Sequence, residues 1–208
     1  MRWRPPVAPD SSTSHPVVTL AELPALVAEL ARRIRAAGFR PDILVYVEEG
    51  ARLPAAALCR ELGLNAVPVI ARRRGHGLKK VMAPLIALMP RALTNFLRRT
   101  EERSRVHAQG GRTAIWPHDF AGPVGNILLL DDAADTGSTL AAVKTALVHR
   151  GMEAARIRTA VLCATTEAGR AQADFYVLER NCVLPWSPDS AERKTALALM
   201  AETLPPRP

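Results

Sequence analysis

Apolar residues follow two patterns along the chain, and together they predict alternating helices and strands. Positions three or four residues apart are apolar from Leu23 to Ile34, which predicts a helix that stops near Gly38. Short apolar runs rich in β-branched residues predict strands covered on both faces. The predicted strands are 43–47, 67–71, 127–130, 157–163 and 175–178, with helices at 53–62 and 140–148 between them. This order predicts an α/β fold with a doubly wound, mainly parallel sheet.

The chain is long enough for one ordinary domain with short appendages. Residues 1–18 are rich in Pro, Ser and Thr without an apolar period, and we expect a flexible arm there. The main domain is predicted at 19–190, with a C-terminal helix and tail at 191–208. Residues 71–112 interrupt the alternation and are too long for an ordinary connection, which predicts an inserted flap or helical hairpin.

Positive charge is concentrated in that insert. It holds eleven Lys or Arg and two Glu, a local balance of +9 within a chain of net charge +8. Several uses remain open: a flap that draws in an anionic substrate, a hairpin packed on its own domain, or a surface for a partner subunit, a membrane or nucleic acid. The scarcity of aromatic residues argues against a base-stacking platform for single strands.

Cysteine usage and hydropathy bear on the compartment. Cys59, Cys163 and Cys182 are widely spaced and form no Cys-x-x-Cys pair, so we expect buried, reduced thiols. The sequence contains neither a run of about 18 apolar residues, as a membrane span needs, nor a secretory signal. We therefore expect a cytoplasmic protein.

The string ILLLDDAADTGSTL, residues 127–140, carries the chemistry. Asp131 and Asp132 follow a predicted strand at the edge of the sheet where open α/β folds bind ligands. Two carboxylates there can accept hydrogen bonds from sugar hydroxyls and help hold Mg²⁺ through water. Residues 136–139 offer amides and hydroxyls at a helix N-terminus, which favours a phosphate. Helix capping alone would not require so many acidic residues together.

This string resembles the phosphoribosyl diphosphate (PRPP) signature of type I phosphoribosyltransferases. The similarity extends over most of residues 19–186, and the segments around Phe39, Pro54, Asp174 and Trp186 resemble the bacterial hypoxanthine and xanthine-guanine enzymes. It implies the type I fold with a small C-terminal hood, transfer of 5-phosphoribose from PRPP to a heterocyclic base, Mg²⁺ as cofactor, and a homo-oligomer, either dimer or tetramer.

The resemblance also implies roles for single residues. Asp135 matches an aspartate that exchanges a proton with N7 of a 6-oxopurine. The PRPP-binding positions are Asp131, Asp132, Ala133, Ala134, Thr136, Gly137, Ser138 and Thr139. The diphosphate loop comprises Glu49, Gly50, Ala51 and Arg52, and the flap includes Arg72, Arg73, Arg74 and Lys79. The base pocket is expected at Thr165, Asn181 and Trp186, with a packing role as the alternative for Trp186.

Four positions depart from the pattern of the family. In the diphosphate loop, Glu49 stands where the family often has an arginine and Ala51 where it has a second glycine. In the base pocket, Thr165 or Thr166 lies near the position of a lysine, and Asn181 replaces an aromatic residue. We expect phosphoribosyl transfer to a purine-like, 6-oxopurine base with release of diphosphate. The alternatives are a same-fold enzyme with an unusual acceptor in specialised metabolism, or a PRPP-sensing regulator that binds nucleic acid.

Overall fold

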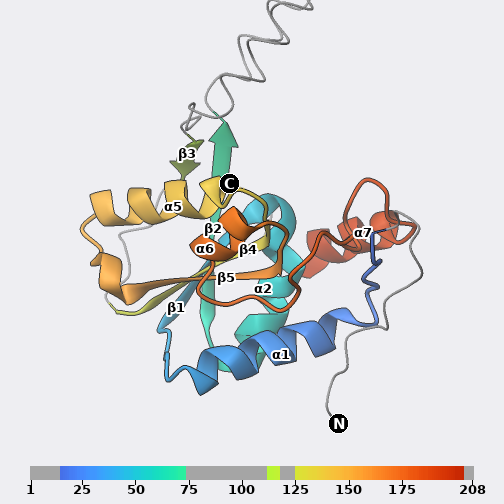
Figure 1. Ribbon diagram of the computed structural model, residues 1–208, viewed down its shortest axis with the longest axis horizontal. Coiled ribbons are helices and arrows are strands. Elements are labelled where there is room, and N and C mark those ends of the chain that lie inside the picture. The colour runs from blue at the N-terminus through green and yellow to red at the C-terminus, as the bar shows by residue number, and fades with distance from the viewer. Residues whose placement is uncertain (1–14, 74–111, 118–124, 204–208) are drawn as a thin grey trace, which may run out of the picture.

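Five strands form one sheet in the order β3-β2-β1-β4-β5 (Figure 1). The computed structural model describes residues 15–73, 112–117 and 125–203. The strands are β1 (Ile43–Val47), β2 (Asn65–Arg73), β3 (Arg112–Ile115), β4 (Ile127–Ala134) and β5 (Ile157–Ala164). The helices are α1 (Leu23–Ala36), α2 (Glu48–Leu62), α5 (Ser138–His149), α6 (Glu167–Gln172) and α7 (Arg193–Thr203), with a 3₁₀ turn at Ala154–Arg156.

The sheet is parallel except at one edge. β1 pairs in parallel with β2 and β4, and β4 pairs in parallel with β5, whereas β3 runs antiparallel to β2. The predicted mainly parallel α/β fold is therefore confirmed. Because parallel strands end at the same edge, the segments that follow β1, β4 and β5 come together there.

Side chains alternate between two apolar layers. In β1, Leu44 and Tyr46 face the layer that contains residues of α1 and α2, while Val45 and Val47 face the layer that contains residues of α5. Figure 1 shows α1 and α5 on opposite sides of the sheet. Coverage on both faces explains why these strands read as continuous apolar runs.

Several elements differ from the sequence predictions, and β3 and α6 were not predicted at all. α2 begins at Glu48, five residues before the predicted start, and continues through Pro54. β4 extends to Ala134, so the acidic pair lies inside the strand rather than after it. The predicted strand at 175–178 makes only isolated bridges to β5, at Phe175 and Leu178. Residues 175–178 are hydrogen-bonded to β5, but the pairing is interrupted between the two bridges, so they do not form a continuous strand.

The prediction of a flexible arm at 1–18 is wrong for its last residues. The amide of Val18 donates to the carbonyl of Val183 (2.9 Å), and the amide of Val183 donates to the carbonyl of Pro16 (2.9 Å). The carboxylate of Glu192 accepts from the amide of Leu20 (2.7 Å). These backbone partners lie about 165 positions away along the chain, where no local pattern could reveal them.

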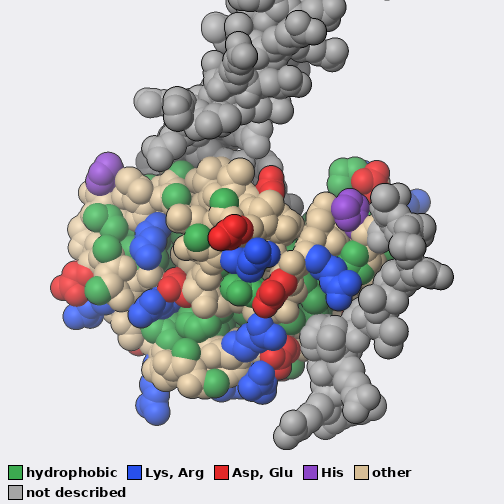
Figure 2. Space-filling model, viewed as in Figure 1, with side chains coloured by type: hydrophobic (Ala, Val, Ile, Leu, Met, Phe, Trp, Pro, Cys, Tyr) green, Lys and Arg blue, Asp and Glu red, His purple; other side chains and the backbone are tan. Residues whose placement is uncertain are grey.

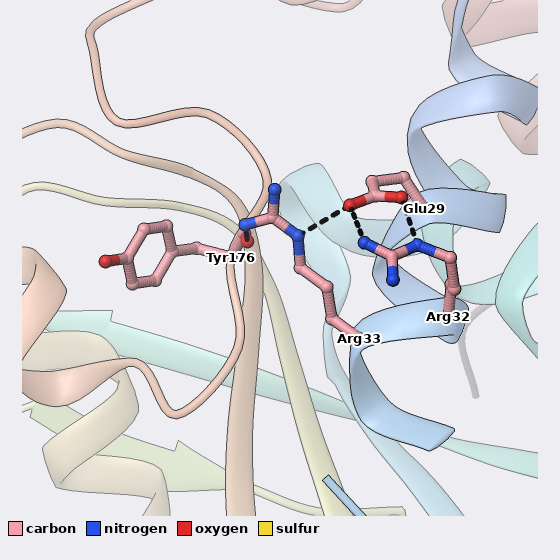
Figure 3. Close-up of polar contacts among 4 residues, drawn as sticks. All are labelled: Glu29, Arg32, Arg33 and Tyr176. Atoms are coloured by element: carbon pink, nitrogen blue, oxygen red, sulfur yellow. Dashed lines mark hydrogen bonds and ion pairs between the residues drawn. The ribbon is translucent and has the colours of Figure 1, made fainter. Parts of the chain in front are cut away.

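Helix α1 is joined to the segment beside β5 by a cluster of charged side chains (Figure 3). Arg33 donates to the carbonyl of Tyr176 (2.5 Å) and to the carboxylate of Glu29 (2.8 Å). Arg32 donates to the same carboxylate through two nitrogens, both at 2.7 Å. Glu29 therefore orients the guanidinium that connects the two segments.

A disulfide joins Cys163 of β5 to Cys182, whereas Cys59 is free. The expectation of three reduced thiols is therefore wrong for two of them. The reason is tertiary: Cys163 and Cys182 are 19 positions apart and belong to no spacing motif, yet the chain after α6 returns alongside β5.

Charges are mixed on the face that Figure 2 shows, where Lys and Arg alternate with Asp and Glu instead of gathering in a patch. The basic insert beyond Arg73 lies outside the described residues, so neither the flap nor the hairpin prediction is tested. Within the described parts of the chain, no helix combines the length and apolar character that crossing a membrane requires.

Candidate functional site

The carboxyl end of β4 brings the acidic pair to the edge of the sheet. Asp131 is buried, with 6% of its surface exposed, because it pairs within the sheet with Val161 of β5. Its carboxylate accepts from the amide of Asp132 (3.0 Å), and that of Asp132 accepts from the amide of Ala133 (2.8 Å). The strand and its own backbone thus orient both carboxylates.

Asp132 also contacts two segments that are remote in the sequence. Its Oδ2 accepts a hydrogen bond from the indole nitrogen of Trp186 at 2.7 Å. Its carboxylate lies against Gly50 in the first turn of α2, where an added Cβ would stand 2.1 Å from Oδ2. Sequence reasoning placed Gly50 in a diphosphate loop and did not find this contact, which only the fold creates.

The turn after β4 leads into α5 as the sequence predicts. Gly137 precedes the helix with φ of 68°, a left-handed conformation that glycine adopts readily. A Cβ on Gly137 would stand 2.3 Å from the Cβ of Gln172, so α6 packs against the turn. The hydroxyl of Thr136 accepts weakly from the amide of Ser138 (3.4 Å). The remaining amides at the start of α5 are donors suited to a phosphate.

Asp135 is exposed beyond the end of β4 and is held by two threonines. Thr165 donates to the Asp135 carboxylate at 3.0 Å, and Thr166 donates to the Asp135 carbonyl at 2.5 Å. The amide of Gly169 donates in turn to the Thr166 hydroxyl at 3.1 Å. Thr165 was predicted in the base pocket, and the structure places it directly beside the predicted acid/base group.

Some of these residues line a cavity of about 340 Å³, whereas Asp135, Thr165 and residues 136–138 are not among its lining residues. Its walls come from the ends of β1, β2 and β4, from α2 and α5, and from the segment before α7. The lining residues are Val47, Gly50, Ala71, Asp131, Asp132, Ala133, Thr139, Trp186, Ser187 and Pro188. Among the residues that the structure describes, the lining contains two carboxylates and no Lys or Arg.

Residues 49–52, predicted as the diphosphate loop, belong instead to the start of α2, which begins at Glu48. Arg52 points away from the cavity: it donates to the Met200 carbonyl of α7 (3.0 Å) and forms an ion pair with Glu48. Ala51 is fully buried, Gly50 lines the cavity, and the side chain of Glu49 lies outside the described part of the structure. A helix replaces the loop because the buried Glu48 and Arg52 side chains are one turn apart and satisfy each other.

The predicted base-pocket residues are not all brought together. Trp186 lines the cavity and is also buried in the main core, with 7% of its surface exposed, so it both packs and faces the site. Asn181 is exposed and lies 3.4 Å from the ring of His15, away from the lining residues. Arg72 and Arg73 belong to β2, and their side chains, like all of Arg74 and Lys79, lie outside the described part.

Comparison with protein families matches residues 18–192 to the family described as phosphoribosyl transferase domain. The chain belongs to this family. No curated protein sequence gives a significant match. The family match covers the acidic pair, the turn at 136–139 and Trp186 together.

Solved structures show the same fold as this phosphoribosyl transferase domain. The xanthine-guanine-hypoxanthine phosphoribosyltransferase of Helicobacter pylori has a TM-score of 0.60 and 15% identity, covering 89% of this chain and 99% of that one. A purine phosphoribosyltransferase from Pyrococcus horikoshii has a TM-score of 0.55 and 19% identity, covering 83% and 93%. The hypoxanthine phosphoribosyl transferase of Trypanosoma cruzi has a TM-score of 0.53 and 20% identity, covering 83% of each chain.

The donor set of the phosphoribosyl transferase domain is compatible with Mg²⁺ shared with a substrate. Mg²⁺ prefers oxygen ligands and usually takes one or two carboxylates together with phosphate oxygens and waters. Asp131 and Asp132 supply such carboxylates. No group of three or more His, Cys, Asp or Glu side chains gathers as a metal site within the described residues. An ion here would therefore depend on oxygens of the ligand.

Proposed function

We propose that this domain transfers 5-phosphoribose from PRPP to a 6-oxopurine and releases diphosphate in an Mg²⁺-dependent reaction. Family membership supports the coarser statement, that it is a phosphoribosyltransferase. The observation that carries the finer proposal is the placement of Asp135, held by Thr165, directly between the acidic pair and the phosphate turn. A carboxylate in that position suits proton exchange with the base.

Different residues of the chain would serve different steps of this reaction. Amides and hydroxyls at 136–139 would bind the 5′-phosphate, and Asp131 and Asp132 would accept hydrogen bonds from the ribose hydroxyls. The bond from C1′ to diphosphate breaks as a ring nitrogen of the base attacks C1′, and Asp135 takes the proton that the base loses. Bound Mg²⁺ would supply charge neutralisation for the departing diphosphate. Catalysis is then mainly positioning and charge stabilisation.

The test is diphosphate release from PRPP and Mg²⁺ with hypoxanthine, guanine, xanthine, adenine, uracil or orotate as acceptor. We expect rapid release with a 6-oxopurine. Replacing Asp135→Asn should lower turnover about 100-fold or more, since general acid–base catalysis contributes on this scale, and should leave PRPP binding largely intact. Glu167→Gln is the matched control, because Glu167 is a nearby exposed carboxylate at the start of α6.

If no base of the panel leads to diphosphate release, two further observations distinguish the unusual-acceptor enzyme from the sensor. Release with none of these bases, although PRPP binds, would reject the 6-oxopurine proposal and favour an enzyme with an unusual acceptor. Salt-sensitive nucleic-acid binding that disappears when Arg72, Arg73 and Arg74 are replaced by Gln would instead favour the sensor.

A further inference from the structure

The segment 181–190, here called the hood, is fastened to the domain at several points. Val183 hydrogen-bonds the N-terminal segment through both its amide and its carbonyl, each at 2.9 Å. Cys182 is bonded to Cys163 of β5. Within the hood, the amide of Leu184 donates to the Ser187 hydroxyl at 3.0 Å. A segment held in this way can present a side chain in one fixed orientation.

Trp186 is the hood side chain that reaches the acidic pair. Its ring is buried in the same apolar layer as Leu184, Met200 and residues of α1, and only 7% of its surface is exposed. Its polar edge faces Asp132, with 2.7 Å between the indole nitrogen and Oδ2. Burial of the ring fixes the direction of the N–H bond, so the donor does not have to be ordered when a ligand binds.

Asp132 is constrained on three sides. The amide of Ala133 holds one oxygen at 2.8 Å, the indole of Trp186 holds the other, and the bare backbone of Gly50 lies against the carboxylate. An ionised carboxylate has about four acceptor sites, so two donors leave acceptor capacity that faces the cavity. Rotation of the group would break a hydrogen bond or collide with α2.

We propose that Trp186 is a positioning residue: its indole N–H holds the Asp132 carboxylate in the orientation that accepts the sugar hydroxyls of PRPP. The proposal rests on the proposed function and adds a link between the hood and the sugar site. Trp186 acts through Asp132, and its hydrogen bond is needed whether or not the ring also touches the base.

Replacing Trp186→Phe removes the N–H and keeps most of the aromatic ring. A hydrogen bond to a charged group corresponds to about a tenfold effect or more on an equilibrium constant, so we expect the KM and Kd for Mg²⁺–PRPP to rise about tenfold. The KM of the base and kcat should change much less. Trp116→Phe is the control, because the guanidinium of Arg150 lies over the Trp116 ring and Trp116 is not among the residues that line the cavity.

A second variant tests the same orientation from the opposite side. Gly50→Ala would place a methyl group 2.1 Å from Oδ2 of Asp132, which forces the carboxylate away from the indole. Alanine is the better helix former, so α2 itself should not be weakened. We expect the same selective rise in KM for PRPP, and no further rise when Gly50→Ala and Trp186→Phe are combined.

A readout without ligand checks the contact itself. In the intact chain, the indole N–H of Trp186 should exchange slowly with solvent. NMR of ¹⁵N-labelled tryptophan measures this exchange rate. The variant Asp132→Ala should accelerate the exchange at least tenfold. If wild type binds PRPP and Trp186→Phe binds it equally well, the positioning role is overturned while the proposed function stands. If wild type neither binds nor cleaves PRPP, the proposed function fails and the positioning role fails with it.

Discussion

Arg52 shows how a single side chain can differ from its expected role. The sequence predicts it beside diphosphate, whereas in the structure it joins α2 to the last turn of α7 through Met200. Its partner Glu48 is buried, with 5% of the side chain exposed, and Arg52 itself is 12% exposed. The guanidinium therefore serves the packing of two helices.

We expect Arg52→Ala to lower the free energy of unfolding by about 3 kcal/mol, because removing one member of a buried pair leaves a charge without that partner. Arg32→Ala, which breaks an exposed pair on α1, should cost far less. Denaturant unfolding of both variants measures the difference. Unchanged stability together with weaker PRPP binding would restore the diphosphate role for Arg52.

For single residues, the sequence predicts the part of the site that consecutive residues form, but not the contacts between residues that are far apart in the chain. Residues 131–139 could be found because strand, acidic residues and turn follow one another in a single string. The contacts of Gly50 and Trp186 with Asp132, and of Thr165 with Asp135, join positions that are 30 to 82 residues apart. Their partners are set by how strands order in the sheet, which local patterns do not encode.

The helices and strands were largely predictable because each buries an apolar face. The early start of α2 was missed for a physical reason: Pro54 favours the first turn of a helix, so the sequence places the start near Leu53. The helix nevertheless continues through Pro54, which cannot donate to the carbonyl of Gly50. The buried pair of Glu48 and Arg52 and the contact with α7 stabilise the extra turn.

The disulfide between β5 and the hood should increase the stability of the fold by connecting two elements. Closing a loop of this length stabilises a fold by about 3 kcal/mol in the chain-entropy model. A reducing agent should therefore lower the Tm of wild type and leave that of the double variant Cys163→Ala, Cys182→Ala unchanged. Thermal unfolding with and without reductant measures both.

Thiol titration provides the independent check. The unreduced, unfolded protein should show one reactive thiol, that of Cys59; three would contradict the disulfide. In the folded protein this thiol should react slowly, because burial raises the pKa of Cys59 to about 11 and leaves little thiolate near neutral pH.

For the whole molecule, stability should depend on pH through the cluster in Figure 3. The hydrogen bond from Arg32, aided by Arg33 and opposed by burial, lowers the pKa of Glu29 from 4.5 to about 2. A carboxyl whose pKa falls on folding stabilises the native state above its unfolded pKa. That contribution is complete above pH 4.5 and disappears as the pH falls toward 2.

Glu29→Gln removes the titrating group and keeps the shape of the side chain. We expect the variant to be less stable than wild type at pH 6, with a gap that narrows at pH 3, measured by urea unfolding at both values. A gap that does not change with pH would show that Glu29 acts through packing and not through its charge.

The pairing of Arg73 with Arg112 fixes where the basic segment leaves and re-enters the domain. Register partners on adjacent antiparallel strands are neighbours in space, so chain added or removed between them leaves every other strand pair unchanged. The segment between the two arginines can therefore be exchanged without altering the sheet that forms the cavity. Replacing it with a short hairpin turn would show how much of the activity depends on the residues of the cavity and how much on the basic segment.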